Sequence, residues 1–355
     1  MRAVIFEQFG ARPVVARLPD PACPPAGVLV DVRSTGLCRS DWHGWMGHDE
    51  GIALPHVPGH ELAGVIAEVG PSVTSWQVGD RVTVPFVCAC GECATCLRGD
   101  GQVCERQSQP GFTHWGSFAE LVAINHAEVN LVRLPDQMSF DVAASLGCRF
   151  ATAYRAVRQL GRPEPADWVA VHGCGGVGLS AVMIAAAHGA RVVAVDISPH
   201  ALQLAREAGA TQTVLAREGI NVPDEILDIT GGGARVSIDA LGSVPTCTNS
   251  ILSLGRRGRH VQVGLMLGND QQPPIPMDRV ISYELELLGT HGLAAHSYPA
   301  LLSEIEAGVL APQKLVARSI DLSQACEALT RIDQQPGVGI TMIHPAETDP
   351  VDREG

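Results

Sequence analysis

The chain has 355 residues, 46% of them hydrophobic, and its 25 basic against 38 acidic side chains give a formal net charge of −13. Two domains are expected at this length, and an acidic balance without basic runs argues against nucleic acid or an anionic membrane surface as a partner. A small uncharged substrate is more compatible with this acidic net charge. The start of the sequence lacks the features of a signal peptide, so the 11 cysteines indicate metal ligation and buried thiols in a cytoplasmic protein rather than disulfides.

Up to about Phe150, short β-type runs are separated by Gly, Pro and Asp turns. Runs of this kind predict a β-rich domain that resembles a barrel. The expected strands cover residues 1–7, 28–32, 63–69, 81–84, 118–124 and 129–134.

From about Ala151 the pattern changes to strands that alternate with helices, which is typical of a parallel, doubly wound sheet. The long apolar tract 169–197 is interrupted by charged, imidazole and glycine positions, so we do not expect it to cross a membrane as one helix. The expected strands are 168–172, 191–195, 236–239, 260–263 and 285–288, and the expected helices are 177–187, 201–208 and 246–254. After residue 289 mixed elements are expected to return to the first domain.

Three residues far apart in the sequence form a candidate metal site. Cys38, His60 and Cys148 supply two thiolates and one imidazole, the ligand set of a zinc site with an open fourth position. Each residue alone is more often a buried core residue, but the three together favour a metal. Asp41, which could otherwise be a cap or turn residue, is the type of side chain that orients a ligating imidazole.

Four closely spaced cysteines predict a second metal site. They follow the pattern Cys-x2-Cys-x2-Cys-x7-Cys, so one loop can fold around a tetrahedral structural zinc. An iron–sulfur cluster and a run of free thiols are the alternatives, and spacing does not exclude a fifth thiol, Cys88. The four ligands are Cys90, Cys93, Cys96 and Cys104.

A glycine-rich loop between an expected strand and an expected helix predicts a dinucleotide site. Its backbone amides can approach a pyrophosphate at the start of the helix. Asp196, at the end of the next strand, can accept from both ribose hydroxyls of NAD and would repel the extra phosphate of NADP; a purely structural Asp is the alternative. The loop consists of Gly173, Cys174, Gly175, Gly176, Val177 and Gly178.

With these motifs assembled, the sequence resembles the zinc-dependent medium-chain alcohol dehydrogenases over nearly its whole length. The cysteine lobe and the segment 111–114 are most similar to the short yeast-type and bacterial branch, so a homotetramer is expected rather than a dimer. The resemblance implies an α/β protein with a GroES-like β-rich catalytic domain over 1–150 and 291–355 and a Rossmann coenzyme domain over 151–290. The matching segments are 59–64, 78–82, 90–104, 111–114, 146–148 with 151–154, and 173–178.

The resemblance implies an NAD-dependent alcohol dehydrogenase that moves a hydride reversibly between a zinc-bound alcohol and NAD, giving an aldehyde or a ketone. A polyol dehydrogenase is the alternative, although such relatives often have Glu at the third ligand position, where Cys148 stands here. Glutathione-dependent formaldehyde oxidation is a less favoured alternative, because the sequence has no evident basic cluster to bind the glutathione carboxylates. A non-catalytic NAD-binding structural or sensor protein would not need the complete set of site residues.

Residue by residue, the resemblance assigns further roles. It implies two zinc ions per chain, the catalytic one at Cys38, His60 and Cys148, with Asp41 and Glu61 behind it. Ser40 takes the alcohol proton, which leaves through the nicotinamide ribose and His43. The other expected cofactor contacts are Arg39 at the pyrophosphate, Asp196 and the glycine loop, and Thr152, Val177, Val263, Gly264 and Leu265 around the nicotinamide.

The expected substrate pocket is mostly apolar and suits a small alcohol, aldehyde or ketone. Phe86, Trp45 and Trp115 are its candidate wall residues, each with plain core packing as the alternative. Two positions depart from the family pattern. Trp115 stands where yeast-type relatives often have Asp, and Ala201 stands where many have a Lys near the adenosine ribose.

Overall fold

The computed structural model describes residues 1–333 and 339–346, and the chain divides into two compact units. Unit 1 comprises Met1–Cys148, Gly292–Ser303 and the described residues from Val316 onward, and unit 2 comprises Arg149–His291 and Glu304–Leu315. The sequence-based boundaries near 150 and 290 stay a prediction. In the structure the short segment Glu304–Leu315 packs with unit 2.

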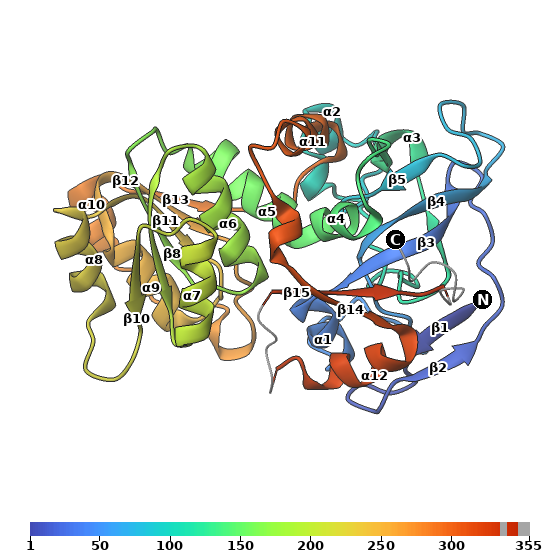
Figure 1. Cartoon of the computed structure of the whole chain (residues 1–355), viewed down its shortest axis with the longest axis horizontal. Coiled ribbons are helices and arrows are strands. Elements are labelled where there is room, and N and C mark those ends of the chain that lie inside the picture. The colour runs from blue at the N-terminus through green and yellow to red at the C-terminus, as the bar shows by residue number, and fades with distance from the viewer. Residues whose placement is uncertain (334–338, 347–355) are drawn as a thin grey trace. The chain divides into compact units, whose positions relative to one another are not determined.

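Unit 1 is built on a mixed sheet (Figure 1). Among the described residues, seven strands form it in the order β14-β15-β3-β4-β5-β7, with β6 also paired to β3, while β1 and β2 form a separate antiparallel pair. The strands are β1 (Arg2–Ile5), β2 (Val14–Arg17), β3 (Val28–Leu37), β4 (Glu61–Val69), β5 (Arg81–Thr83), β6 (Leu121–Ile124), β7 (Val132–Arg133), β14 (Val316–Asp321) and β15 (Ile340–His344). The helices are α1 (Arg39–Trp45), α2 (Ala94–Leu97), α3 (Ala127–Asn130), α4 (Phe140–Ser145), α11 (Tyr298–Glu306), whose last three residues belong to unit 2, and α12 (Leu322–Arg331).

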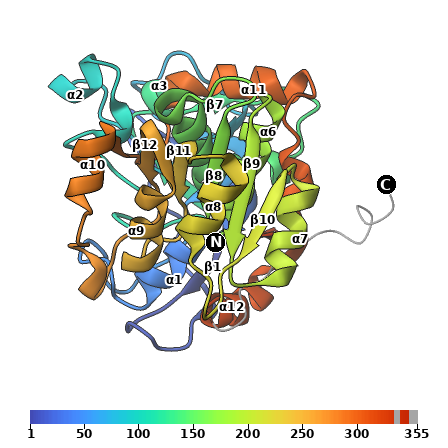
Figure 2. The ribbon, with the colours of Figure 1, turned by 90° about the vertical axis from the view of Figure 1, so that its left-hand side faces the viewer.

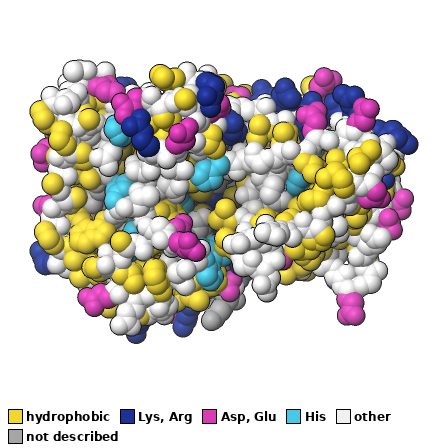
Figure 3. Space-filling view, turned by 180° about the vertical axis from the view of Figure 1, so that it is seen from behind, with side chains coloured by type: hydrophobic (Ala, Val, Ile, Leu, Met, Phe, Trp, Pro, Cys, Tyr) yellow, Lys and Arg dark blue, Asp and Glu magenta, His cyan; other side chains and the backbone are white. Residues whose placement is uncertain are grey.

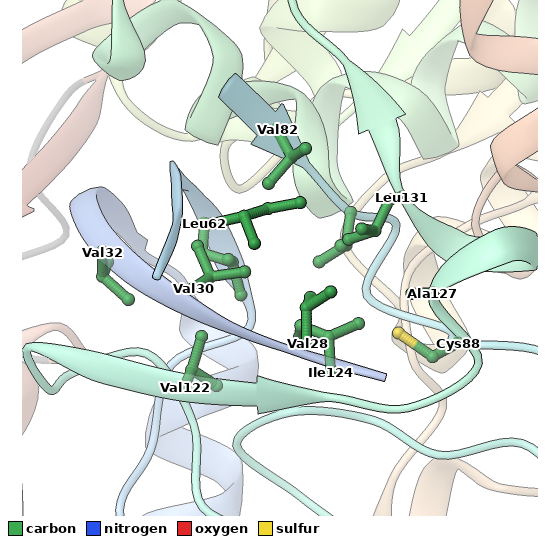
Figure 4. Close-up of a cluster of buried hydrophobic side chains, with 12 residues drawn as sticks. Val28, Val30, Val32, Leu62, Val82, Cys88, Val122, Ile124, Ala127 and Leu131 are labelled. Carbon is green, nitrogen blue, oxygen red and sulfur yellow. The ribbon is translucent and has the colours of Figure 1, made fainter. Parts of the chain in front are cut away.

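The alternating sequence of β3 explains the core of unit 1. Val28, Val30 and Val32 lie two residues apart, so their β-branched side chains share one face of the strand. They are fully buried against Leu62 of β4 and Val122 of β6 (Figure 4). This packing fixes the paired ends of β3 and β4, where Cys38 follows β3 and His60 directly precedes β4.

Unit 2 contains a parallel, doubly wound sheet. Its strand order is β10-β9-β8-β11-β12-β13, and each neighbouring pair is parallel. Helices cover both faces, as Figure 2 shows for the unit turned toward the viewer. The strands are β8 (Trp168–His172), β9 (Arg191–Asp196), β10 (Gln212–Leu215), β11 (Ala234–Asp239), β12 (Leu254–Gln262) and β13 (Glu286–Gly289). The helices are α5 (Ala151–Tyr154), α6 (Gly176–Ala187), α7 (Pro199–Glu207), α8 (Val222–Thr230), α9 (Val244–Leu252) and α10 (Met277–Tyr283).

The expected fold class, a β-rich domain plus a doubly wound parallel-sheet domain, is confirmed. One expected strand is wrong in part, because residues 129–134 contain the end of helix α3 and only a two-residue strand, β7. None of the helices in the described ranges combines the length and the apolar character that a membrane crossing requires. On the face in Figure 3, acidic and basic side chains both occur, with hydrophobic side chains between them.

Candidate metal centres and cofactor loop

A single carboxylate, Asp41, organises the first part of the site. Helix α1 begins after Cys38, and Asp41 Oδ2 accepts a hydrogen bond from the Cys38 backbone N–H at 2.9 Å, which caps the helix. Asp41 Oδ1 accepts from the Gly59 backbone N–H at 3.0 Å and from His60 Nδ1 at 2.8 Å. Because an ionised carboxylate only accepts, Nδ1 of His60 carries a hydrogen, and Nε2 is the nitrogen that can bind a cation. Asp41 thus fixes both the helix start and the imidazole.

The expected catalytic ligands meet in unit 1. One donor atom each from Cys38, His60, Glu61 and Cys148 lies within 4.8 Å of the others. Within the described part of the chain, His60 Nε2 has no hydrogen-bond partner although it is buried. Two thiols, an imidazole nitrogen and a carboxylate suit a borderline cation such as zinc.

The electrostatics of His60 favour positive charge at this point. Burial alone lowers the pKa of His60, but the charge of Asp41 and its hydrogen bond outweigh burial and raise the pKa well above its ordinary value. A cation bound at Nε2 satisfies the same preference as a proton does.

Two contacts hold the turn that carries Cys148. This turn is a π-helical segment, Leu146–Phe150, that follows α4. The backbone N–H of Phe86 donates to the Gly147 carbonyl at 3.0 Å, and the hydroxyl of Tyr298 donates to the Leu146 carbonyl at 3.1 Å. Burial raises the pKa of Tyr298, so its hydroxyl stays protonated and remains a donor. The sequence offers no signal for this role, because Tyr298 lies far away along the chain.

The candidate pocket residues lie in different surroundings. The ring of Phe86 has its centroid 6.2 Å from that of His60, and the ring of Phe112 lies closer, at 5.2 Å. Trp45 packs in a hydrophobic cluster with β1 and α12, and Trp115 packs against a second cluster near β1. A pocket role for these two tryptophans stays a prediction, while Phe112 is a neighbour of the site that sequence reasoning missed.

The four closely spaced cysteines form a second cluster, in a lobe around α2. Their sulfur atoms are separated by 3.4 to 3.9 Å in the pairs with measured contacts. A tetrahedral zinc with Zn–S bonds of about 2.3 Å places its sulfurs about 3.8 Å apart, so the cluster fits this ion. The ligand atoms all lie within 4.8 Å of one another and belong to Cys90, Cys93, Cys96 and Cys104.

Backbone amides prepare this lobe for negative sulfur atoms. The Cys96 N–H donates to Cys93 Sγ at 3.4 Å, and this bond is the main cause that lowers the pKa of Cys93 to about 6. The guanidinium of Arg106 lies 3.5 Å from Cys90 Sγ. The fifth thiol is different, because Cys88 is buried in the core of unit 1 and burial raises its pKa to about 12.

The other predicted site residues on helix α1 are partly or fully exposed at the surface of unit 1. Ser40 Oγ is 3.7 Å from Cys38 Sγ. The expected pyrophosphate ligand Arg39 forms an exposed ion pair with Asp333 at 2.7 Å. His43 Nδ1 lies 3.0 Å from Nδ1 of His48, a residue that the motif comparison did not single out. Burial, followed by the charges of Arg39 and His48, lowers the pKa of His43 to about 4.

The glycine loop in unit 2 has the close approach that its sequence predicts. Gly173 has φ of +90°, and a Cβ on Gly178 would lie 1.8 Å from the Gly173 carbonyl oxygen, so no other residue fits there. Asp196 Oδ2 accepts from the Cys174 N–H at 2.7 Å, and Oδ1 accepts from the Ser198 N–H at 2.8 Å. The loop and the acidic strand end are therefore held together as one element.

Further expected cofactor residues lie elsewhere in unit 2. Thr152 is buried in α5, and its Oγ1 has no hydrogen-bond partner among residues 1–333 and 339–346. The Val263 and Gly264 amides both donate to the Asp239 carbonyl at 2.9 Å, and Gln262 Nε2 donates to the Gly264 carbonyl at 2.9 Å. Leu265 is half exposed. Asp239 and Gln262, which hold this segment, were not predicted.

Comparison with known proteins agrees with this arrangement. Residues 24–136 match the family described as alcohol dehydrogenase GroES-like domain, and residues 176–307 match the one described as zinc-binding dehydrogenase. The chain is 36% identical over 293 residues to an alcohol dehydrogenase of Geobacillus stearothermophilus, which covers 82% of this chain and 84% of that protein. The chain belongs to the zinc-dependent medium-chain alcohol dehydrogenase family.

Other relatives match this chain over nearly its whole length. An NAD-dependent alcohol dehydrogenase of Sulfurisphaera tokodaii is 31% identical over 97% of this chain and 100% of its own length. The crystal structure of alcohol dehydrogenase TADH from Thermus sp. ATN1 has a TM-score of 0.89 and 32% identity, covering 97% of this chain and 99% of that chain. A sorbitol dehydrogenase of Halalkalibacterium halodurans is 30% identical over 91% of this chain and 94% of its own length. The chain is accordingly an oxidoreductase of the alcohol dehydrogenase type.

Proposed function

We propose that this family member is an NAD-dependent alcohol dehydrogenase that converts small, mostly apolar alcohols to aldehydes or ketones and runs in both directions. We also propose two zinc ions per chain, one catalytic and one structural. The observation that carries the proposal is the meeting of Cys38, His60 and Cys148 with Asp41 behind the imidazole. A homotetramer and a cytoplasmic location stay predictions.

The donor sets support both metal sites. In the catalytic set, Asp41 holds a hydrogen on His60 Nδ1 and leaves Nε2 to bind the cation, which is how ligating histidines are commonly oriented. A carboxylate oxygen of Glu61 lies within 4.8 Å of the other donor atoms, so Glu61 would offer a fourth ligand while no substrate is bound. When bound there, zinc would act as a Lewis acid that makes an alcohol hydroxyl more acidic, and NAD would accept the hydride.

Side chains of helix α1 would transfer the hydroxyl proton of the alcohol away from the site. Ser40 Oγ lies beside Cys38, where it can accept the hydroxyl proton of an alcohol held in the site. His43, one helical turn further along α1, lies nearer to the surface and has a pKa lowered to about 4. A group with such a pKa gives up a proton readily, so His43 suits the outer end of the proton path.

Asp196 supports NAD over NADP. Each of its carboxylate oxygens accepts one backbone amide, which holds the carboxylate at the strand end next to the glycine loop. A second lone pair on each oxygen is available for a ribose hydroxyl. The following residues, Ile197, Ser198 and Pro199, offer no cation for a 2′-phosphate.

The test follows NADH formation by purified, zinc-replete protein with primary, secondary, benzylic and polyol substrates, and repeats the series with NADP. We expect alcohol-dependent reduction of NAD with little activity on NADP. Ser40→Ala should lower turnover by roughly 10²-fold or more while both zinc ions stay bound. A protein that reduces NAD only with polyols would establish the polyol alternative, and an inactive wild-type protein with a full zinc content would refute the proposal.

A further inference from the structure

The end of helix α1 brings a second histidine onto His43. The Gly47 N–H donates to the Gly44 carbonyl at 3.0 Å, and the His48 N–H donates to the His43 carbonyl at 3.0 Å. Gly47 has φ of +78°, so the pattern is a Schellman motif with glycine in the left-handed position. This motif places His48 against His43, at the two positions that usually make a hydrophobic contact.

In this protein that contact is a hydrogen bond. The Nδ1 atoms of His43 and His48 are 3.0 Å apart, and the two ring centroids are 5.3 Å apart. The ring of Trp42 meets both imidazoles edge-on, with centroids 5.0 and 5.5 Å away. Two Nδ1 atoms at this distance share one hydrogen, so one ring donates and the other accepts. The backbone motif and the tryptophan thus hold the rings as a matched pair.

We propose that His48 is the last member of the proton path, which accepts the catalytic proton from His43 and releases it to solvent. This inference rests on the proposed function, because it extends the path that begins at Ser40. His48 is exposed, whereas His43 is half-buried. An exposed ring at the end of the path has more contact with water and buffer than the half-buried inner ring.

The proton balance is complete within the two rings. His43 begins with its hydrogen on Nδ1, donated to the bare Nδ1 of His48, and His48 carries its own hydrogen on Nε2. When a proton arrives at His43 Nε2, the Nδ1 hydrogen moves to His48 Nδ1, and the Nε2 hydrogen of His48 leaves to water. One proton enters and one leaves, and no bond between heavy atoms changes. Each ring is left as its other neutral tautomer, which must exchange its hydrogen before the next turnover.

The surroundings of His43 disfavour a proton on its ring, because burial, Arg39 and His48 lower its pKa more than Cys38 and Asp333 raise it. Arg39, Cys38, His48 and Asp333 are the charged and titratable groups that act on it. Burial is the largest cause that lowers its pKa, and Arg39 adds to it. A cationic His43 is therefore costly, while the exposed His48 can be hydrated as a cation. Transfer from His43 to His48 runs from the less solvated ring to the more solvated one.

Two substitutions separate a proton path from simple packing. His48→Asn keeps an amide that can hydrogen-bond to His43 Nδ1 but cannot pass a proton through. His48→Phe keeps a hydrophobic contact at this position of the motif but removes the hydrogen bond. His296→Asn, at an exposed histidine in the same unit, is the matched control.

Turnover is measured at low buffer concentration and again with added imidazole. We expect His48→Asn and His48→Phe to lower kcat about threefold to tenfold at low buffer, because an outer position contributes less than a central acid or base. Imidazole should restore both variants, and the KM for NAD should be unchanged. His296→Asn should match the wild type throughout.

A second readout needs no cofactor. Imidazole nitrogen NMR of histidine-labelled protein should show His43 protonated at Nδ1 and His48 at Nε2, and His48→Phe should change the His43 signals. Normal kcat of His48→Asn at low buffer, or a loss that imidazole does not restore, would overturn the proton path. Wild-type protein without alcohol-dependent NADH formation would refute the proposed function and the path with it, whereas an active wild type indifferent to His48 would refute the path alone.

Discussion

Replacing Asp41 with Asn should loosen the catalytic metal while leaving the structural one in place. Asp41 accepts three hydrogen bonds, from the Cys38 and Gly59 amides and from His60 Nδ1. Asn has one acceptor oxygen, which can keep the hydrogen bonds from the Gly59 N–H and His60 Nδ1. Its NH2 group then faces the Cys38 N–H, and because both groups are donors, that hydrogen bond is lost. A hydrogen bond to a charged group contributes about 1.5–3 kcal/mol, and the two retained bonds weaken as they become neutral. We therefore expect a loss of about 3 kcal/mol in the free energy of unfolding.

The affinity for the catalytic zinc should fall by about 10- to 100-fold, as is typical when the partner of a ligating histidine is removed. Metal analysis after dialysis against increasing chelator, combined with urea unfolding, measures both effects. Asp31→Asn is the control, because the Asp31 carboxylate forms an exposed ion pair with Arg33, and its replacement should change stability by about 0.5 kcal/mol or less. If the Asp41 variant kept its zinc and its stability like the control, Asp41 would not be the support of this site.

Three further outcomes are expected. Cys96→Ser should remove one of the two expected zinc ions per chain and destabilise the lobe, as metal analysis and thermal unfolding would show; loss of both ions would contradict two separate sites. Asp196→Ala should weaken NAD binding by about 10- to 100-fold in a fluorescence titration, because ribose hydroxyls lose a charged acceptor, and unchanged affinity would contradict that role. The hydrogen bond to Asp141 raises the pKa of His344, so its contribution to stability is complete below the ordinary value of 6.5 and is lost as the pH rises through the raised pKa. His344→Gln should reduce the pH-dependent part of the free energy of unfolding in urea by about 1 kcal/mol or less, since the His344–Asp141 pair is partly exposed. An unchanged pH dependence would contradict a stabilising role of this pair.

The sequence predicts unit 2 more closely than unit 1. Strand β8 spans Trp168–His172 as expected, and helix α6 begins one residue before its prediction, because apolar strands bounded by glycine give strong local signals. Helix α9 ends at Leu252, two residues early, because Leu254 already starts β12. Strand β10 and helix α8 were not predicted, although α8 has Asn221 and Pro223 at its start. Their short, mixed sequences carry weaker periodicity.

The candidate site also has a part that the sequence predicts and a part that it does not. That Cys38, His60 and Cys148 lie together could be predicted, because metal chemistry restricts which residues can serve as ligands; their role as zinc ligands stays a prediction. The contacts that hold them could not, since Tyr298 and Phe112 reach the site only through tertiary packing. The position of His48 follows from the way one helix ends, and a local motif search that stops at His43 misses it.

The pairing of β15 bears on how the protein is made. This strand, Ile340–His344, lies antiparallel to β3 and pairs Met342 with Gly36, two residues before Cys38. During synthesis the chain of unit 2 is therefore made before the sheet of unit 1 gains this strand. Until β15 joins, β3 has an unpaired edge at Thr35, Gly36 and Leu37, and an exposed edge of this kind is open to pairing with other chains.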